Sequence, residues 1–249
     1  MRSFFLSLFM VLFTTLASAQ NYDNMSDAET EAFGAAVRAY LLENPEVIRE
    51  AVAVLEQRQQ QASAVTDQDL VVQYAEALFN DGFSHVGGNP DGTIQVVEFS
   101  DYKCGFCKRA YPEILQLIEN NPDIRLVVKE YPILGAESVL ASRAAIAVLV
   151  NDGGEIYELF HDALMLENGP LNEISLPLIA ESVGADSAKM VEIMGSALVT
   201  QMIQSNRTLG QQMAISGTPT FVIGGEMLRG YLPLAGLQQY VDQARQATN

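Results

Sequence analysis

The chain has 249 residues with 31 acidic and 14 basic side chains, which gives a formal net charge of −17 at neutral pH. Nucleic acid and anionic lipid surfaces repel a chain of this charge, so the composition argues against either as a partner. The length is sufficient for one large domain with an appendage.

The first 19 residues have the pattern of a secretory signal peptide. Arg2 supplies a positive charge, residues 4–16 form an apolar core, and Ala17-Ser18-Ala19 is typical of a cleavage site. The apolar core is shorter than the ~20 residues that a membrane-spanning helix needs, and the alternative to cleavage is an uncleaved anchor. We therefore expect an exported, periplasmic protein whose mature form begins near Gln20.

Residues 20–66 are predicted to form a helical arm ahead of the main domain. Apolar residues recur at helical spacing on either side of Asn44-Pro45-Glu46, which is typical of a helix start. A polar run over residues 56–61 then separates the arm from the domain, either as solvated helix or as linker. The apolar stripe has to be buried, either on the chain's own domain or between copies of the arm. We expect a homo-oligomer that forms through residues 27–61.

The two cysteines lie close together, directly after an apolar run. Residues 94–99 are typical of a short buried strand, and apolar residues recur at helical spacing over residues 108–120. Cys104 is therefore predicted at a strand-to-helix junction, with Cys107 one turn into the helix. The free amides and the helix dipole at such a junction stabilise an anion, so the pKa of Cys104 is expected to fall from ~8.5 into the range of roughly 3.5–7.5. A bridge between the two would close a loop too small to stabilise the fold, which indicates a reactive pair.

The segments after the cysteines alternate between strand and helix patterns. Residues 124–131 are predicted to form a second strand, so that the cysteine helix becomes the crossover of a βαβ unit. Residues 136–213 are predicted to be a helical insert, whose last helix runs from Ser187 to about Met213. The apolar runs on both sides of Gly224-Gly225 indicate a β-hairpin, and a final helix follows.

Three short motifs carry a resemblance to a known family. They are Val97-Glu98-Phe99 with Cys104-Gly105-Phe106-Cys107, then Lys129-Glu130-Tyr131-Pro132, and then Gly217-Thr218-Pro219-Thr220-Phe221. With these motifs in this order, the sequence resembles the DsbA family of exported thiol–disulfide oxidoreductases over about residues 92–247. The resemblance implies an α/β protein, a thioredoxin fold with an inserted helical domain, here over residues 67–249 and preceded by the N-terminal helical arm.

The arm carries a resemblance of its own. Tyr40-Leu41-Leu42-Glu43-Asn44-Pro45-Glu46 is similar to the leader of the ScsC-like (suppressor of copper sensitivity) and Com1-like branch of the DsbA family. In that branch the leader promotes oligomer formation, which agrees with the oligomer expected from the apolar stripe.

The cysteine pair is the expected reaction centre. Cys104 is the predicted nucleophile, with the charge of Lys103 favouring its thiolate, and Cys107 resolves the mixed disulfide that forms with a substrate. Glu98 lies on the buried strand, where an unpaired carboxylate is costly, so we predict that Lys129 on the neighbouring strand is its partner. The alternative for Lys129 is a surface lysine at a strand end. By resemblance, Glu98 relays the proton to and from Cys107.

The resemblance also implies how the substrate is held and in which direction the pair works. Pro219 is expected to follow a cis peptide bond beside the cysteines, where the backbone pairs with the substrate as an added strand, and the alternative is an ordinary trans turn. Gly105 and Phe106 offer only backbone amides to the thiolate, and Thr218 is similar to the residue of isomerase and reductase members. We therefore expect a disulfide isomerase or reductase with a potential nearer to about −180 than to about −120 mV, with a dithiol oxidase as the alternative.

The expected partners are cysteine-containing exported proteins and a membrane redox partner that resets the pair, and no cofactor is expected. A zinc or soft-metal module is the first rival interpretation, but His85 and His161 are isolated and far apart in sequence, so the CxxC lacks the other half of such a site. A Cu(I) site on the two thiolates is a secondary alternative. The methionines of the helical insert are more typical of core residues than of copper ligands. A peroxidase of thioredoxin fold and a purely structural export protein are further alternatives.

Overall fold

The computed structural model describes the backbone of residues 25–248 and the side chains of residues 25–58 and 66–247. The predicted signal peptide over residues 1–19 lies outside the described residues. The chain divides into two compact units, residues 1–58 and residues 59–249.

The first unit contains helix α1 (Asp27–Glu43) and the start of helix α2 (Glu46–Gln73). The Ser26 side chain accepts a hydrogen bond from the Glu29 amide, and the Glu29 carboxylate accepts one from the Ser26 amide, which satisfies amides that the first helical turn leaves free. Helix α2 continues without a break through the polar run over residues 56–61, so this run is helix rather than linker.

The second unit is built on a five-stranded sheet with the order β1-β3-β2-β4-β5. The central pair β2 and β3 is parallel, as the βαβ prediction requires, and the other neighbours are antiparallel. Gly224 and Gly225 have φ values of 61° and 124°, which suit glycine, and they form the turn of the predicted hairpin. The strands are β1 (His85–Gly88), β2 (Ile94–Ser100), β3 (Ile124–Glu130), β4 (Thr220–Ile223) and β5 (Glu226–Arg229). Strand β1 falls in a stretch that the sequence pattern indicates only as turns.

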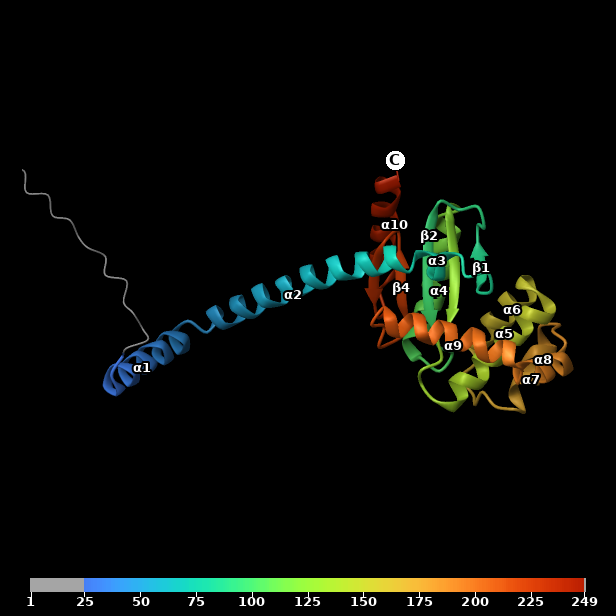
Figure 1. Ribbon diagram of the computed structural model, residues 1–249, viewed down its shortest axis with the longest axis horizontal. Coiled ribbons are helices and arrows are strands. Elements are labelled where there is room, and N and C mark those ends of the chain that lie inside the picture. The colour runs from blue at the N-terminus through green and yellow to red at the C-terminus, as the bar shows by residue number, and fades with distance from the viewer. Residues whose placement is uncertain (1–24, 249) are drawn as a thin grey trace, which may run out of the picture. The chain divides into compact units, whose positions relative to one another are not determined.

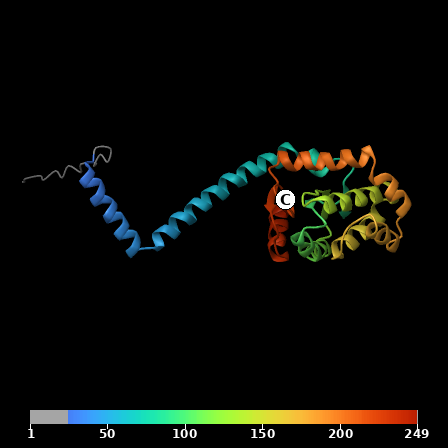
Figure 2. The same ribbon diagram turned by 90° about the horizontal axis from the view of Figure 1, so that it is seen from below.

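Helices cover both faces of the sheet. On one face, apolar side chains of β2, β3 and β4 pack against α4 (Gly105–Asn120) and α10 (Leu234–Thr248). On the opposite face, the alternate residues of these strands pack against the end of α2, α3 (Ala75–Phe79) and α9 (Ala197–Gln212). Figure 2 shows α9 on one side of this unit and α4 and α10 toward the other.

The helical insert lies between β3 and β4 in sequence and beside the sheet in space (Figure 1). The predicted single helix from Ser187 to Met213 is wrong, because the chain turns at Gly195 and starts α9 with Ser196 as its N-cap. A glycine followed by a serine is a good helix stop and restart. The insert consists of α5 (Ala136–Asp152), α6 (Gly154–Leu166), α7 (Ser175–Ser182), α8 (Ser187–Met194) and α9. Its methionines are core residues, as predicted, with Met165, Met190, Met202 and Met213 buried.

Lys129 is fully buried, and its partner is not the one that the sequence predicts. In the register of the parallel pair, Glu98 lies opposite Val128, whereas Lys129 lies opposite Phe99. Because successive side chains point to opposite faces of a sheet, Glu98 and Lys129 cannot meet. The Lys129 Nζ instead donates to the Asp81 carboxylate at 2.6 Å and to the Ala77 carbonyl at 2.7 Å. The predicted Glu98–Lys129 pair is therefore wrong, and so is the alternative of a surface lysine.

We predict that Lys129→Met destabilises the fold by about 3 kcal/mol, because it leaves the largely buried Asp81 carboxylate without its counter-ion. Urea unfolding measures the loss. Lys189→Met is the matched control, since the Lys189–Glu192 pair is exposed and should contribute little. Equal losses in the two variants would contradict the prediction.

Candidate active site

Cys104 lies at the N-cap of helix α4, in extended backbone that turns into the helix. The loop before it is held by the buried Asp101, whose carboxylate accepts hydrogen bonds from the amides of Lys103, Ile133 and Leu134 at 2.8, 2.8 and 3.1 Å. The Cys104 amide donates to the Asp101 carbonyl at 3.0 Å. The strand-to-helix junction predicted from the sequence is thus confirmed, and a buried carboxylate holds it in shape.

The environment of Cys104 favours its thiolate. A hydrogen bond from the Cys107 thiol is the largest influence, and together with Thr218 and the amides of Cys107 and Phe106 it outweighs the opposing effect of burial. The pKa of Cys104 falls from 9.0 to about 5. At neutral pH this sulfur is therefore an anion at the start of a helix, where the dipole also favours negative charge.

Cys107 has the opposite character. It is fully buried in the first turn of α4, and its pKa is raised far above 9.0 by the hydrogen bond that it donates to Cys104, by desolvation and by the nearby Glu98. The pair therefore holds one negative charge, on the outer sulfur, and one proton, on the inner sulfur. This division allows the outer sulfur to attack a disulfide while the inner sulfur waits as a thiol.

The loop before β4 lies directly beside this pair. The peptide bond between Thr218 and Pro219 is cis, as the resemblance implies, and the Thr218 carbonyl lies 3.1 Å from the Cys104 Sγ as acceptor for its thiol form. The sequence motif around Pro219 and the cysteine motif are more than a hundred residues apart, and the β2–β4 pairing brings them together.

The flanking residues Gly105 and Phe106 form the start of α4. Phe106 is exposed at 58 %, and its amide contributes to the Cys104 thiolate. The Lys103 ammonium forms an ion pair with Glu137 at 2.8 Å, so a carboxylate partly neutralises the charge that was expected to act on Cys104. Lys108, next to Cys107, donates through its ammonium to the carbonyls of Leu164 and Met165 at the end of α6, at 3.0 and 3.2 Å.

Glu98 is buried at 3 % exposure and shares one face of the sheet with the cysteine pair. Its pKa is raised to about 7 by burial, against the influence of the nearby Ser100 hydroxyl, and the charges of Glu130 and Cys104 add to the rise. None of the ion pairs among the described side chains includes Glu98. A carboxyl with this pKa can both give and accept a proton near neutral pH.

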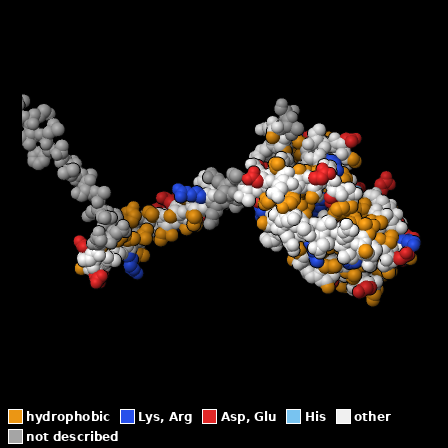
Figure 3. Space-filling view, in the orientation of Figure 1, with side chains coloured by type: hydrophobic (Ala, Val, Ile, Leu, Met, Phe, Trp, Pro, Cys, Tyr) orange, Lys and Arg blue, Asp and Glu red, His pale blue; other side chains and the backbone are white. Residues whose placement is uncertain are grey.

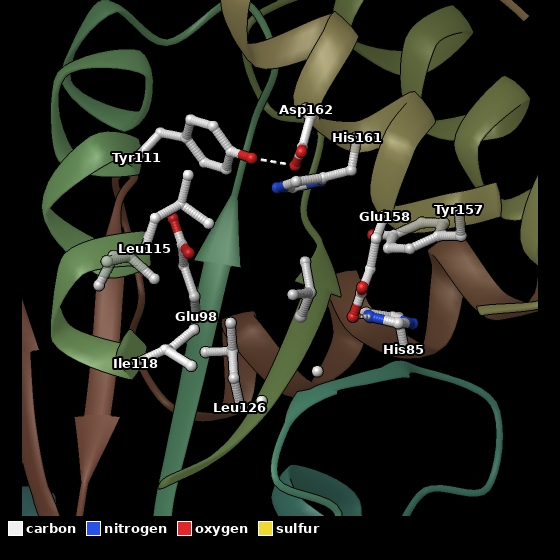
Figure 4. A pocket seen from close by; sticks show the side chains of 14 residues that line it. His85, Glu98, Tyr111, Leu115, Ile118, Leu126, Tyr157, Glu158, His161 and Asp162 are labelled. Carbon is white, nitrogen blue, oxygen red and sulfur yellow. Dashed lines mark hydrogen bonds and ion pairs between the residues drawn. The ribbon is translucent and has the colours of Figure 1, made fainter. Parts of the chain in front are cut away.

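Glu98 points into a cavity of about 220 Å³ between the sheet, α4 and α6 (Figure 4). The walls are largely apolar and include Leu115, Ile118, Leu126 and Val128. A cavity of this volume has room for several water molecules at ~30 Å³ each, and the Glu98 carboxyl supplies a polar partner for them.

Two histidines that the sequence presents as isolated meet at this cavity. His85 on β1 lies 3.0 Å from the Glu158 carboxylate, and its ring centroid lies 4.5 Å from that of Tyr157. The His161 ring stacks on the Tyr157 ring at 5.7 Å between centroids. No sequence pattern indicates this cluster, because β1 is not predicted and it is the antiparallel β1–β3 pairing that brings His85 to α6.

Within the part of the chain that the structure describes, no three His, Cys, Asp or Glu side chains come together as a metal site. None of the described helices is long and apolar enough to span a membrane.

Comparison with known proteins defines the class. The family model described as the DSBA-like thioredoxin domain matches residues 95–242, more than half of the chain, and the chain belongs to this family. The model of the copper resistance protein ScsC N-terminal domain matches residues 29–62. The chain thus combines a DsbA-like thioredoxin domain with an N-terminal segment like that of ScsC.

Several solved structures share this fold. A thioredoxin-like oxidoreductase from Silicibacter pomeroyi is 41 % identical with a TM-score of 0.65, over 69 % of this chain and 97 % of that one. Salmonella enterica Typhimurium BcfH is 30 % identical with a TM-score of 0.73, over 87 % and 96 %. A linker-deletion mutant of Proteus mirabilis ScsC is 26 % identical with a TM-score of 0.69, over 91 % and 100 %.

The curated relatives that the chain matches first are longer proteins. Na(+)/H(+) antiporter NhaA 1 of Salinispora arenicola is 27 % identical over 160 residues, which are 64 % of this chain and 24 % of the relative. The chain spans about a quarter of the length of the curated relatives that it matches first.

We predict that the Cys104 thiol of the reduced protein titrates with a midpoint near pH 5. The pH dependence of its alkylation rate measures this. Cys107→Ala removes the largest stabilising hydrogen bond and should raise the midpoint, whereas Cys107→Ser retains a hydroxyl donor and should raise it less. A wild-type midpoint near the ordinary thiol value of 9.0 would contradict the prediction.

We predict that Glu98→Gln increases the stability of the protein relative to wild type more at pH 8 than at pH 4. Folding raises the pKa of Glu98 from 4.5 to about 7, so the folded state binds more protons in this window and loses stability as the pH rises through it. The difference in unfolding free energy between variant and wild type should grow by about 3 kcal/mol between the two pH values.

The matched control for this measurement is Glu137→Gln. Folding lowers the pKa of the exposed Glu137 through its hydrogen bond from Lys103, so this carboxylate stabilises the fold at high pH and the change should have the opposite sign. Urea unfolding at both pH values measures these free energies. A difference between Glu98→Gln and wild type that does not vary with pH would contradict the raised pKa of Glu98.

Proposed function

We propose that this protein is a disulfide isomerase or reductase for cysteine-containing exported proteins. The observation that carries the proposal is the division of charge within the pair, a stabilised thiolate at Cys104 and a buried thiol at Cys107. Cys104 acts as the nucleophile and Cys107 as the resolving cysteine. The signal-peptide pattern of the first 19 residues supports a periplasmic location.

In the reducing direction, the Cys104 thiolate attacks one sulfur of a substrate disulfide, and the other substrate sulfur leaves as a thiolate that takes up a proton. Cys107 then passes its proton to Glu98, attacks the Cys104 Sγ and displaces the substrate sulfur. The substrate gains two electrons and the pair becomes a disulfide, which a membrane redox partner reduces again. In isomerisation, the freed substrate thiolate attacks a second substrate disulfide, and the thiolate released from that bond attacks the substrate sulfur of the mixed disulfide. Cys104 then leaves as a thiolate, with no net redox change.

The loop before β4 is the proposed substrate site. The Thr218 backbone lies in contact with the Cys104 Sγ, and the adjacent Pro219 has no amide to compete for hydrogen bonds. An extended substrate segment adds here as a strand through its backbone, a mode that tolerates many sequences. The exposed Phe106 ring beside the nucleophile offers apolar contact to the substrate's neighbouring side chains.

The pKa of the nucleophile supports the proposed direction. A strongly oxidising pair of this family has a thiolate pKa of about 3.5 and a reducing thioredoxin about 7, and the value of about 5 at Cys104 lies between them. Gly105 and Phe106 offer backbone amides but no further side-chain donor to the thiolate. Less stabilisation of the reduced form makes the pair a weaker oxidant.

The exposed apolar side chains of the arm support the proposal that the protein forms a homo-oligomer through residues 27–61. No residue of α1 is buried, and large apolar side chains along the arm are exposed to solvent, among them Leu42 at 66 %, Tyr40 at 56 % and Leu55 at 56 % (Figure 3). Water-exposed apolar area of this extent on a helix is stabilised when copies of the helix pack together.

A comparison of two activities tests the isomerase assignment. The intact mature protein should refold a scrambled-disulfide substrate faster than it oxidises a reduced one, and a shortened form that begins at Gln59 should lose much of the refolding activity, because it lacks the arm. Light scattering should show an oligomer for the intact form and a monomer for the short one. Cys104→Ala is the inactive control. Faster oxidation than refolding by the intact protein would favour the dithiol oxidase instead.

The standard potential provides an independent prediction. Titration against glutathione should give a value nearer to about −180 than to about −120 mV, because the thiolate is stabilised less than in the strong oxidants. A value at the strongly oxidising end would overturn the isomerase or reductase assignment while leaving the exchange chemistry intact.

A further inference from the structure

Two buried carboxyls share the face of the sheet that holds the cysteine pair. Glu98 on β2 lies opposite Val128, and Glu130 on β3 lies opposite Ser100. Glu98 and Glu130 are therefore diagonal neighbours, and their side chains project from the same face, at a separation of about 7–8 Å between the backbones. Their side chains are nearly excluded from water, with exposures of 3 % and 5 %.

The surroundings of Glu130 favour its charged form over that of Glu98. Its carboxylate accepts hydrogen bonds from the buried hydroxyls of Tyr102 at 2.6 Å and Tyr157 at 2.8 Å. The Tyr102 hydroxyl also lies 2.9 Å from the His161 Nδ1, and burial lowers the pKa of that imidazole to about 3, so it is neutral. Glu98 has no comparable pair of hydroxyl donors and faces the cavity instead. Burial raises the pKa of Glu130 to about 7, as it does that of Glu98, so burial alone does not separate the two carboxyls. The two strong donors on the Glu130 carboxylate favour the charge there.

The other groups that face the two carboxyls do not neutralise them. Asp101 from the loop adds negative charge, and Ser142 from α5 and Tyr111 from α4 are uncharged hydroxyl groups. Glu158 at the cavity forms a hydrogen bond with His85, and burial lowers the pKa of this imidazole, so it adds little positive charge. No described lysine or arginine forms an ion pair with Glu98 or Glu130. A negative charge on one of the two carboxyls therefore disfavours ionisation of the other, and no paired cation among the described side chains offsets this repulsion.

We propose that Glu130 is a positioning residue for disulfide exchange. Held by Tyr102 and Tyr157, Glu130 carries the negative charge of the two carboxyls and so leaves the proton on its neighbour Glu98. The proposal rests on the exchange function and on the relay of a proton between Glu98 and Cys107. Two carboxyls at this separation in a buried site do not ionise independently, and the donors decide which one carries the charge.

The proposed arrangement sets the pH at which Glu98 works. The charge of Glu130 raises the pKa of Glu98, which makes Glu98 a stronger base for the Cys107 proton but leaves it ionised only at higher pH. The step in which Cys107 displaces the substrate from Cys104 should therefore rise with pH around a midpoint that follows Glu98. Removing the charge of Glu130 should move this midpoint to lower pH.

The test measures the rate of that displacement from a preformed mixed disulfide on Cys104, as a function of pH, in the full mature chain. Glu130→Gln should lower the midpoint by about one pH unit relative to wild type, which is the size expected for one charge at this distance. Tyr157→Phe removes one donor to Glu130 and should shift the midpoint in the same direction by less, so it serves if Glu130→Gln does not fold.

Asn206→Leu is the matched control. The Asn206 side chain donates to the Glu130 backbone carbonyl at 3.1 Å, so the substitution disturbs the same position without altering the carboxylate, and the midpoint should not move. An active wild type with the same midpoint in folded Glu130→Gln and Tyr157→Phe would overturn this inference alone. A wild type that exchanges no disulfide would overturn the proposed function with it.

Discussion

The hydrogen bond from the Cys107 thiol to the Cys104 sulfur is the interaction on which the site depends. It needs one sulfur at the open start of a helix, where negative charge is stabilised, and the other in the apolar interior, where charge is disfavoured. The Asp101 carboxylate holds the loop before Cys104 and so fixes the positions of the two sulfurs. The β2–β4 pairing places the Thr218 carbonyl beside the outer sulfur. The first two contacts keep the two sulfurs unlike each other, and the Thr218 carbonyl brings the loop before β4 against the outer sulfur.

The sheet separates two kinds of buried charge. On one face Lys129 and Asp81 neutralise each other and fasten α3 to the strands, a structural use of charge. On the other face Glu98 and Glu130 form no ion pair with any side chain that the structure describes, and burial raises the pKa of each to about 7. A difference of one residue in register decides which face a charged side chain joins, and therefore whether it supports the fold or the chemistry.

The parts of the fold that could be predicted from the sequence are those with local causes. The cysteine junction, the βαβ unit and the Gly224-Gly225 hairpin follow from residue patterns within a few turns of the chain. The Glu98–Lys129 pairing failed because register is a tertiary property, and the cluster around His85 was missed because its strand is recognisable only through its pairing with β3. Glu130 belongs to one of the motifs noted in the sequence, but the tyrosine hydroxyls that hold it come from a loop and a helix distant in the chain.

The ammonium of Lys108 has a mechanical consequence. By binding the carbonyls at the end of α6, it fastens the first turn of the cysteine helix to the helical insert one residue after Cys107. Helix ends leave such carbonyls free, and a cation is their natural partner. The position of the sulfur pair in the fold is therefore set by the helical insert as well as by the sheet, through hydrogen bonds made one residue after the inner sulfur.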